Sequence, residues 1–113
     1  MGIVFERRGP VQILTLDRQE ALNALSLAMI RDLTLLLKAW AAEPAIQAVV
    51  ILGQGREGKP AAFCAGGDIV ALRGNAMAGR VDLVEAFFAE EYELNKIIAS
   101  YPKPYVALVD GVC

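Results

Sequence analysis

The chain has 113 residues, of which 56% are hydrophobic, and its formal net charge at pH 7 is −2. That length allows one small domain and excludes two. The acidic balance lacks the basic footprint of a nucleic-acid-binding protein. Because the sequence contains no histidine, it cannot build Ser-His-Asp, Cys-His or histidine-based metal sites by itself.

The apolar content is high for a domain of this size, with a mean hydropathy of +0.43. Small domains bury a smaller fraction of their surface than large ones, so we expect further polypeptide or another subunit to cover part of it. A membrane is the poorest candidate, since no run of about 18 uncharged apolar residues occurs. No signal-peptide core follows the start either. We expect a cytoplasmic (bacterial) or organelle-matrix protein that is not secreted, with Cys64 and Cys113 as reduced thiols.

The first half of the chain predicts a strand, a helix and a second strand. Residues 11–16 are β-rich and alternate apolar with polar side chains. From Ser26, a plausible N-cap, apolar residues recur at helical spacing as far as Trp40, and Pro44 ends the pattern. The run at 45–52 is continuously apolar, as in a strand of a parallel sheet. This order predicts a right-handed crossover unit.

The second half predicts a glycine turn, a short apolar helix, a long helix and a third strand. A glycine-rich stretch at 74–79 follows the turn, and we expect it to be mobile. Residues 81–100 read as a helix whose apolar side comprises Val81, Val84, Phe88, Tyr92 (or Glu91), Asn95 and Ile98. The segment Tyr101-Pro102-Lys103-Pro104 ends that helix, and residues 105–109 predict the strand.

The turn Ala65-Gly66-Gly67-Asp68 leads into the short helix, which Asp68 is placed to cap. Unpaired N–H groups at such a position can hold an anion or the oxyanion that develops on a thioester carbonyl. Taken alone, the turn is more often an ordinary connector. It is neither a P-loop nor a G-x-G-x-x-G fingerprint.

Three segments resemble the crotonase (enoyl-CoA hydratase/isomerase) superfamily. They are the turn with its flanks at 62–69, the loop Leu16-Asp17-Arg18-Gln19-Glu20-Ala21-Leu22-Asn23-Ala24-Leu25-Ser26, and the segment at 103–111. The resemblance implies an α/β fold, the crotonase-like β-β-α spiral, and an acyl-CoA substrate with no separate cofactor. It also implies that the Gly67 N–H is one of two oxyanion-hole donors and that backbone groups of Ala65, Asp68 and Ile69 line the CoA site.

Within the superfamily, residues 87–95 and 101–105 are similar to the 3-hydroxyisobutyryl-CoA hydrolases of valine breakdown. That likeness implies hydrolysis of a short branched 3-hydroxyacyl-CoA and matches Glu91 to a substrate-contacting glutamate. The alternative for Glu91 is a solvated charge beside Glu90 and Glu93. The alternatives for the whole chain are an enoyl-CoA hydratase/isomerase and a non-catalytic CoA-binding fragment.

The chain departs from the family pattern in its first loop and at its end. Arg18-Gln19-Glu20 stands where the family commonly has Arg-Pro-Lys, so a lysine contact to the CoA phosphates is lost. The second glycine cluster and the catalytic carboxylates would follow Cys113. We therefore expect residues 1–113 to be the N-terminal part of the spiral domain, inactive alone, within an enzyme that forms trimers or hexamers.

Cys64 and the two aspartates of the predicted loops are interpreted as structural rather than catalytic residues. Without histidine to activate it, Cys64 is expected to be a buried structural thiol rather than a nucleophile. Nothing in the spacing brings Asp17 and Asp68 together as a carboxylate pair, and turn or cap roles account for both. No metal site is expected.

Overall fold

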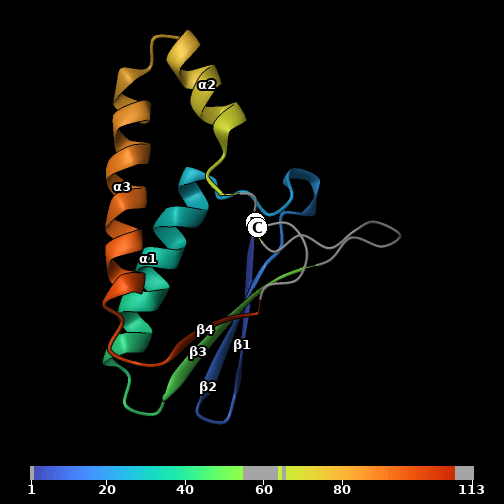
Figure 1. Ribbon diagram of the computed structural model, residues 1–113, viewed down its shortest axis with the longest axis vertical. Coiled ribbons are helices and arrows are strands. Elements are labelled where there is room, and N and C mark those ends of the chain that lie inside the picture. The colour runs from blue at the N-terminus through green and yellow to red at the C-terminus, as the bar shows by residue number, and fades with distance from the viewer. Residues whose placement is uncertain (1, 55–63, 65, 109–113) are drawn as a thin grey trace.

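The computed structural model describes residues 2–54, 64 and 66–108, drawn as coloured ribbon in Figure 1. In chain order the elements are β1 (Ile3–Arg8), β2 (Val11–Leu16), the 3₁₀ turn η1 (Gln19–Ala21), α1 (Leu27–Ala42), β3 (Ala48–Gly53), α2 (Ile69–Met77), α3 (Val81–Ala99) and β4 (Tyr105–Leu108). The α/β class expected from the sequence is confirmed.

The strands form one mixed sheet in the order β1-β2-β3-β4. β1 pairs antiparallel with β2, in a register that places Ile3 opposite Leu16 and Arg8 opposite Val11. β3 runs parallel to both β2 and β4. The parallel β2–α1–β3 connection predicted from the sequence is therefore present, and the β1–β2 hairpin precedes it to complete a β-β-α unit.

Helix α1 begins and ends where its sequence signals indicate. The Ser26 hydroxyl accepts a hydrogen bond from the Met29 N–H at 3.2 Å, so it satisfies one of the unpaired donors of the first turn. The helix buries one stripe, which comprises Met29, Ile30, Leu33, Leu37 and Trp40. This stripe packs with the buried sheet residues Leu14, Leu16, Val49 and Ile51 to form the core.

Helices α1 and α3 lie side by side on one side of the sheet, and α2 folds back against α3 (Figure 1). An ion pair links α1 and α3 on their outer side, because Arg31 Nε and Nη2 reach the two Glu90 oxygens at 2.7 and 2.9 Å. Beyond α3, the Tyr101 hydroxyl donates to the Leu37 carbonyl at 2.6 Å and Lys103 Nζ donates to the Trp40 carbonyl at 2.6 Å. These bonds dock the return segment onto α1.

The inward face of α3 differs from the predicted one. Phe87 and Leu94 are the buried residues of this helix, whereas Phe88 and Tyr92 are 58% and 68% exposed. The predicted apolar side was thus rotated by about one residue at Phe88 and Tyr92, whereas Ile98 packs against the core as predicted. Glu91, the alternative to Tyr92 in the prediction, lies in the stripe that the structure buries and is half-buried there.

Three boundaries also differ from the expectations. Strand β1 was not predicted as an element; its Ile3 packs against the core and its Phe5 lies edge-to-face with Trp40, while most of its side chains are exposed. β3 begins at Ala48 rather than residue 45. Gly74 lies inside α2, so a helix occupies residues 74–77 of the stretch that we expected to be mobile. Val109, the last residue of the third predicted strand, lies outside the described residues.

Candidate functional site

The first loop and the glycine turn meet in a short parallel bridge between Leu25 and Gly67. The Leu25 N–H donates to the Gly66 carbonyl at 2.7 Å, and the Asp68 N–H donates to the Leu25 carbonyl at 2.9 Å. Two segments that resemble the same family, and lie about forty residues apart in the sequence, are therefore joined through their backbones.

This bridge decides where the Gly67 N–H points. In a trans peptide the N–H and C=O lie on opposite sides of the bond. Because the Gly66 carbonyl points toward Leu25, the N–H of the same peptide unit, which belongs to Gly67, points away from it. That N–H donates to no acceptor within the part of the chain that the structure describes. The geometry therefore leaves the Gly67 N–H without a described protein acceptor and directed away from the bridge.

Both glycines are required by the backbone or by close packing. Gly66 has φ +90°, in the region that other residues rarely adopt. An ideal Cβ built on Gly67 would lie 2.8 Å from Phe87 Cζ and 3.1 Å from Glu91 Oε2. Helix α3 therefore approaches the turn so closely that a side chain at position 67 would force Phe87 to shift.

The same contact places Glu91 beside the turn. Glu91 is half-buried and one helical turn beyond Phe87, so both residues point to the same side of α3. The expectation that its neighbours Phe88 and Tyr92 face a core is wrong. Glu91 itself faces inward, and its carboxylate lies next to the backbone of Gly67.

Asp68 caps α2 and is paired with Arg18. Its Oδ1 accepts from the Ala71 N–H at 3.0 Å, and its Oδ2 lies 2.7 Å from Arg18 Nη2. The Ala71 N–H is the largest influence that lowers the pKa of this carboxyl, and Arg18 lowers it further against the opposing effect of burial. Asp68 is 8% exposed. The cap role expected for Asp68 is confirmed.

An open cleft of about 310 Å³ runs between the first loop and the start of α2. The lining residues are Glu20, Ala21, Leu22 and Ala24 on one side and Gly67, Asp68, Ile69 and Val70 on the other. Ile69 and Val70 are 73% and 85% exposed. The cleft thus brings together Gly67, Asp68 and Ile69 of the predicted CoA site, whereas Ala65 lies outside the described residues.

The charge at the cleft mouth is acidic. Glu20 occupies the rim where the family pattern has lysine, and its side chain is 78% exposed. Its carboxylate is 3.9 Å from Arg18 Nε, and that arginine is already engaged with Asp68. The first loop therefore presents no unpaired cation to the cleft among the residues described.

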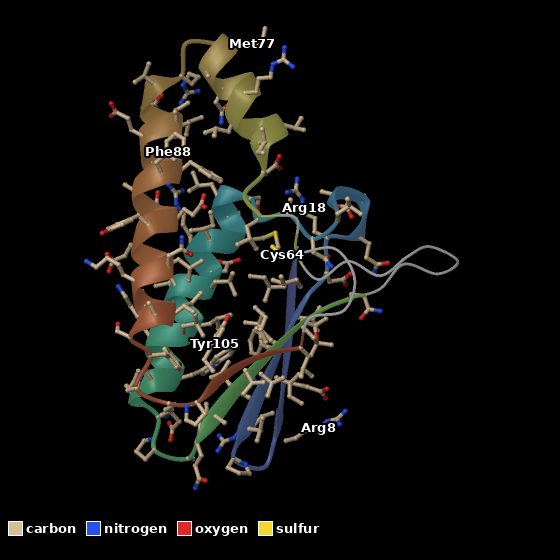
Figure 2. The ribbon with its side chains drawn as sticks, in the orientation of Figure 1. Arg8, Arg18, Cys64, Met77, Phe88 and Tyr105 are labelled. Atoms are coloured by element: carbon tan, nitrogen blue, oxygen red, sulfur yellow. The ribbon has the colours of Figure 1, made fainter. Side chains whose placement is uncertain are left out.

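Cys64 precedes the turn and is half-buried rather than fully buried. Its sulfur accepts from the Gly66 N–H at 3.4 Å and it packs against the core. Figure 2 shows Cys64 and Arg18 near the end of the sheet that lies toward α2. Within residues 2–54, 64 and 66–108, no three His, Cys, Asp or Glu side chains are grouped to hold a metal ion. No helix among these residues is long and apolar enough to cross a membrane.

The sequence did not reveal three residues that build the site. They are Arg18, which pairs with Asp68; Leu25, which hydrogen-bonds to the turn; and Phe87, which packs on Gly67. One signal for Phe87 was available, since Glu91 stands one turn later in the same stripe. A charge in an otherwise apolar stripe is unusual for a buried face and indicates a site there.

The comparisons with known proteins agree on one family. A family model described as enoyl-CoA hydratase/isomerase matches residues 11–113. The mitochondrial 3-hydroxyisobutyryl-CoA hydrolase of Mus musculus is 50% identical over 110 residues, which cover 97% of this chain and 27% of that protein. The chain thus spans about a quarter of the length of the curated relatives it matches.

Two solved structures share the fold. An enoyl-CoA hydratase from Rhodobacter sphaeroides matches with a TM-score of 0.88 at 38% identity, over 98% of this chain and 32% of that one. A carnitinyl-CoA dehydratase from Mycobacterium thermoresistibile matches with a TM-score of 0.88 at 36% identity, over 98% of this chain and 31% of that one. The chain therefore belongs to the enoyl-CoA hydratase/isomerase family, the crotonase superfamily, as its three sequence segments indicated.

Proposed function

We propose that this chain is the N-terminal part of an acyl-CoA thioester hydrolase that converts 3-hydroxyisobutyryl-CoA to 3-hydroxyisobutyrate and CoA in valine catabolism. The observation that carries the proposal is the placement of the Glu91 carboxylate next to Gly67. The N–H of Gly67 points away from Leu25, the residue that pairs with the glycine turn. The 50% identity to the mouse enzyme of that name supports the choice of substrate.

Gly67 supplies one donor of the oxyanion hole. The thioester carbonyl oxygen accepts a hydrogen bond from its N–H, and this bond strengthens as the oxygen becomes negative in the tetrahedral intermediate. Water adds to the carbonyl carbon, the C–S bond breaks, and the thiol of CoA leaves with a proton. The second donor and the carboxylate that activates the water belong to the part of the enzyme that follows residue 113.

Glu91 contacts the acyl group. A thioester oxygen held at Gly67 brings the carbons beyond it close to the Glu91 carboxylate, which is an acceptor for a hydroxyl donor. A 3-hydroxyl group provides that donor, and a plain acyl chain does not. This pairing gives the site a preference for hydroxyacyl thioesters.

The cleft beside the turn accommodates the CoA portion of the substrate. Asp68 and Ile69 line it, and Arg18 neutralises the Asp68 carboxylate. The site needs no cofactor beyond the CoA of its substrate. We place the enzyme in an organelle matrix, or in the cytoplasm of a bacterium, as a trimer or hexamer.

The test is thiol release from 3-hydroxyisobutyryl-CoA by the full-length protein, compared with hydration of crotonyl-CoA. We expect CoA release from the first substrate and little loss of enoyl absorbance with the second. Glu91→Ala should raise KM for the hydroxyacyl substrate about tenfold or more, by roughly the cost of a missing charged hydrogen bond, while Glu93→Ala, on the exposed side of α3, should leave KM unchanged.

The 38% identity to an enoyl-CoA hydratase of known structure favours a second candidate, hydration of an enoyl-CoA. Efficient hydration of crotonyl-CoA without CoA release would establish that candidate and refute the hydrolase. The third candidate is a CoA-binding fragment without catalysis. Calorimetric binding of CoA by a protein that turns over neither thioester would support it.

A further inference from the structure

We infer that Phe87 is a positioning residue for the Gly67 amide, because its ring braces the glycine turn from the side of α3. The inference rests on the proposed role of Gly67 as an oxyanion donor. It adds a residue to that role which does not touch the substrate and acts through the backbone of the turn.

A glycine pair needs an external constraint to act as a rigid donor. Gly66 and Gly67 have no side chains to limit their torsion angles, and an oxyanion donor is effective only when its direction is set before the reaction. The bridge to Leu25 supplies part of that constraint, through the bonds of 2.7 and 2.9 Å described above. Both bonds join one side of the extended turn segment to Leu25 and lie in the plane of that pairing.

Hydrogen bonds along an edge do not prevent movement perpendicular to it. In an extended segment the Cβ direction is perpendicular to the hydrogen-bonding direction. Phe87 blocks this direction, since its Cζ and Cε1 atoms lie 2.8 and 3.2 Å from the ideal Cβ position of Gly67. The ring and the bridge therefore restrict two different displacements of the same peptide unit.

The ring is itself held firmly. Phe87 is 7% exposed and belongs to the core cluster that includes Leu94 on the same helix. Its ring also lies edge-to-face with Phe88, with 6.1 Å between centroids. A buried aromatic ring packed on several sides moves little, so it transmits the position of α3 to the turn.

The test compares Phe87→Leu with Leu94→Val in the full-length protein. Both variants remove part of a buried α3 side chain, but the three atoms nearest to the ideal Cβ position of Gly67 belong to Phe87 and Glu91, and none belongs to Leu94. Two readouts are used: the NMR order parameter of the Gly67 amide without ligand, and kcat and KM for thiol release from 3-hydroxyisobutyryl-CoA. Phe87→Met, which keeps most of the volume but has a flexible tip, gives the same comparison if the leucine variant does not fold.

We expect Phe87→Leu to lower the Gly67 order parameter from about 0.85 toward 0.6 and kcat about tenfold, with KM within about twofold of the wild type. Leu94→Val should change neither readout. Equal effects of both variants on kcat, or an unchanged order parameter in Phe87→Leu, would overturn the inference. A wild-type protein that releases no thiol, but in which only Phe87→Leu loosens Gly67, would refute the proposed function and support the positioning role.

Discussion

Replacing Asp68 tests whether its carboxylate performs two separable tasks. One oxygen caps α2 through the Ala71 N–H, and the other pairs with Arg18 at 2.7 Å. Asp68→Asn keeps an oxygen for the cap, since asparagine is as good an N-cap as aspartate, but it removes the charge. Asp68→Ala removes both.

The structure determines how much each substitution should lower the free energy of unfolding. A hydrogen bond to a charged partner contributes about 1.5–3 kcal/mol, and the lower end applies because the Arg18 side chain is 26% exposed. Its Nη1 also donates to the Ala24 carbonyl at 3.1 Å. We therefore expect Asp68→Asn to lower the free energy of unfolding by about 1–2 kcal/mol and Asp68→Ala by about 2–3 kcal/mol, since loss of the cap adds about 1 kcal/mol.

Urea unfolding monitored by Trp40 fluorescence measures both values. Asp82→Asn is the control, because Asp82 pairs with Arg80 on the surface, with 66% of its side chain exposed, and its loss should change stability little. A double-mutant cycle with Arg18→Gln then isolates the pair. The reasoning fails if Asp68→Asn and Asp68→Ala cost the same, or if the coupling to Arg18 is below about 0.5 kcal/mol.

Three further predictions follow from the packing and the pKa shifts. Gly67→Ala places a methyl group 2.8 Å from the Phe87 ring; thermal and urea unfolding should show a loss of about 1–3 kcal/mol, and an unchanged melting temperature would contradict the contact. The pKa of Asp68 lies below its ordinary value of 3.8, so the stability that its ionisation contributes is present above pH 3.8 and is lost as pH falls through the lower folded-state pKa. Urea titrations should show that the free energy of unfolding falls less between pH 6 and pH 3 in Asp68→Asn than in the wild type. Burial raises the pKa of Tyr105 from 10.0 to about 12, so the free energy of unfolding should fall as pH rises from 10 to 12. Tyr105→Phe should reduce that fall. The same variant should lose the phenolate transition that occurs at the highest pH in the absorbance titration of the wild type.

Helix α1 shows where local signals suffice. Ser26 as N-cap, the apolar spacing from Leu27 to Trp40 and the stop at Pro44 are all short-range features, and the observed helix has these limits. The parallel pairing of the strands on either side followed from the same pattern. The family motifs then located the glycine turn, and its Asp68 cap was correct.

Helix α3 shows where local signals fail. Its sequence offers two neighbouring apolar stripes, one containing Phe88 and Tyr92 and the other containing Phe87 and Leu94. The prediction favoured the first and kept Glu91, in the second, only as an alternative to Tyr92. The structure buries the second, since the glycine turn of another segment leaves room for the Glu91 carboxylate there, and no local pattern reports a contact made 24 residues away in the chain.

The Arg18–Asp68 pair was missed for a related reason. Each residue was explained by its own neighbourhood, Arg18 as part of a loop motif and Asp68 as a cap. Only the fold shows that the bridge between Leu25 and Gly67 brings the two segments within ion-pair distance. Sequence reasoning thus identified the segments of the site but not the contacts between them.

The bridge between Leu25 and Gly67 also bears on how such a site can diverge. Its two hydrogen bonds involve only main-chain atoms, so a substitution at position 25 that keeps the extended backbone preserves both of them. The side chains that line the cleft, such as Glu20, Ile69 and Val70, can meanwhile change without disturbing the direction of the Gly67 N–H. A lineage can therefore change the walls of the cleft by mutation while inheriting the same orientation of the Gly67 N–H.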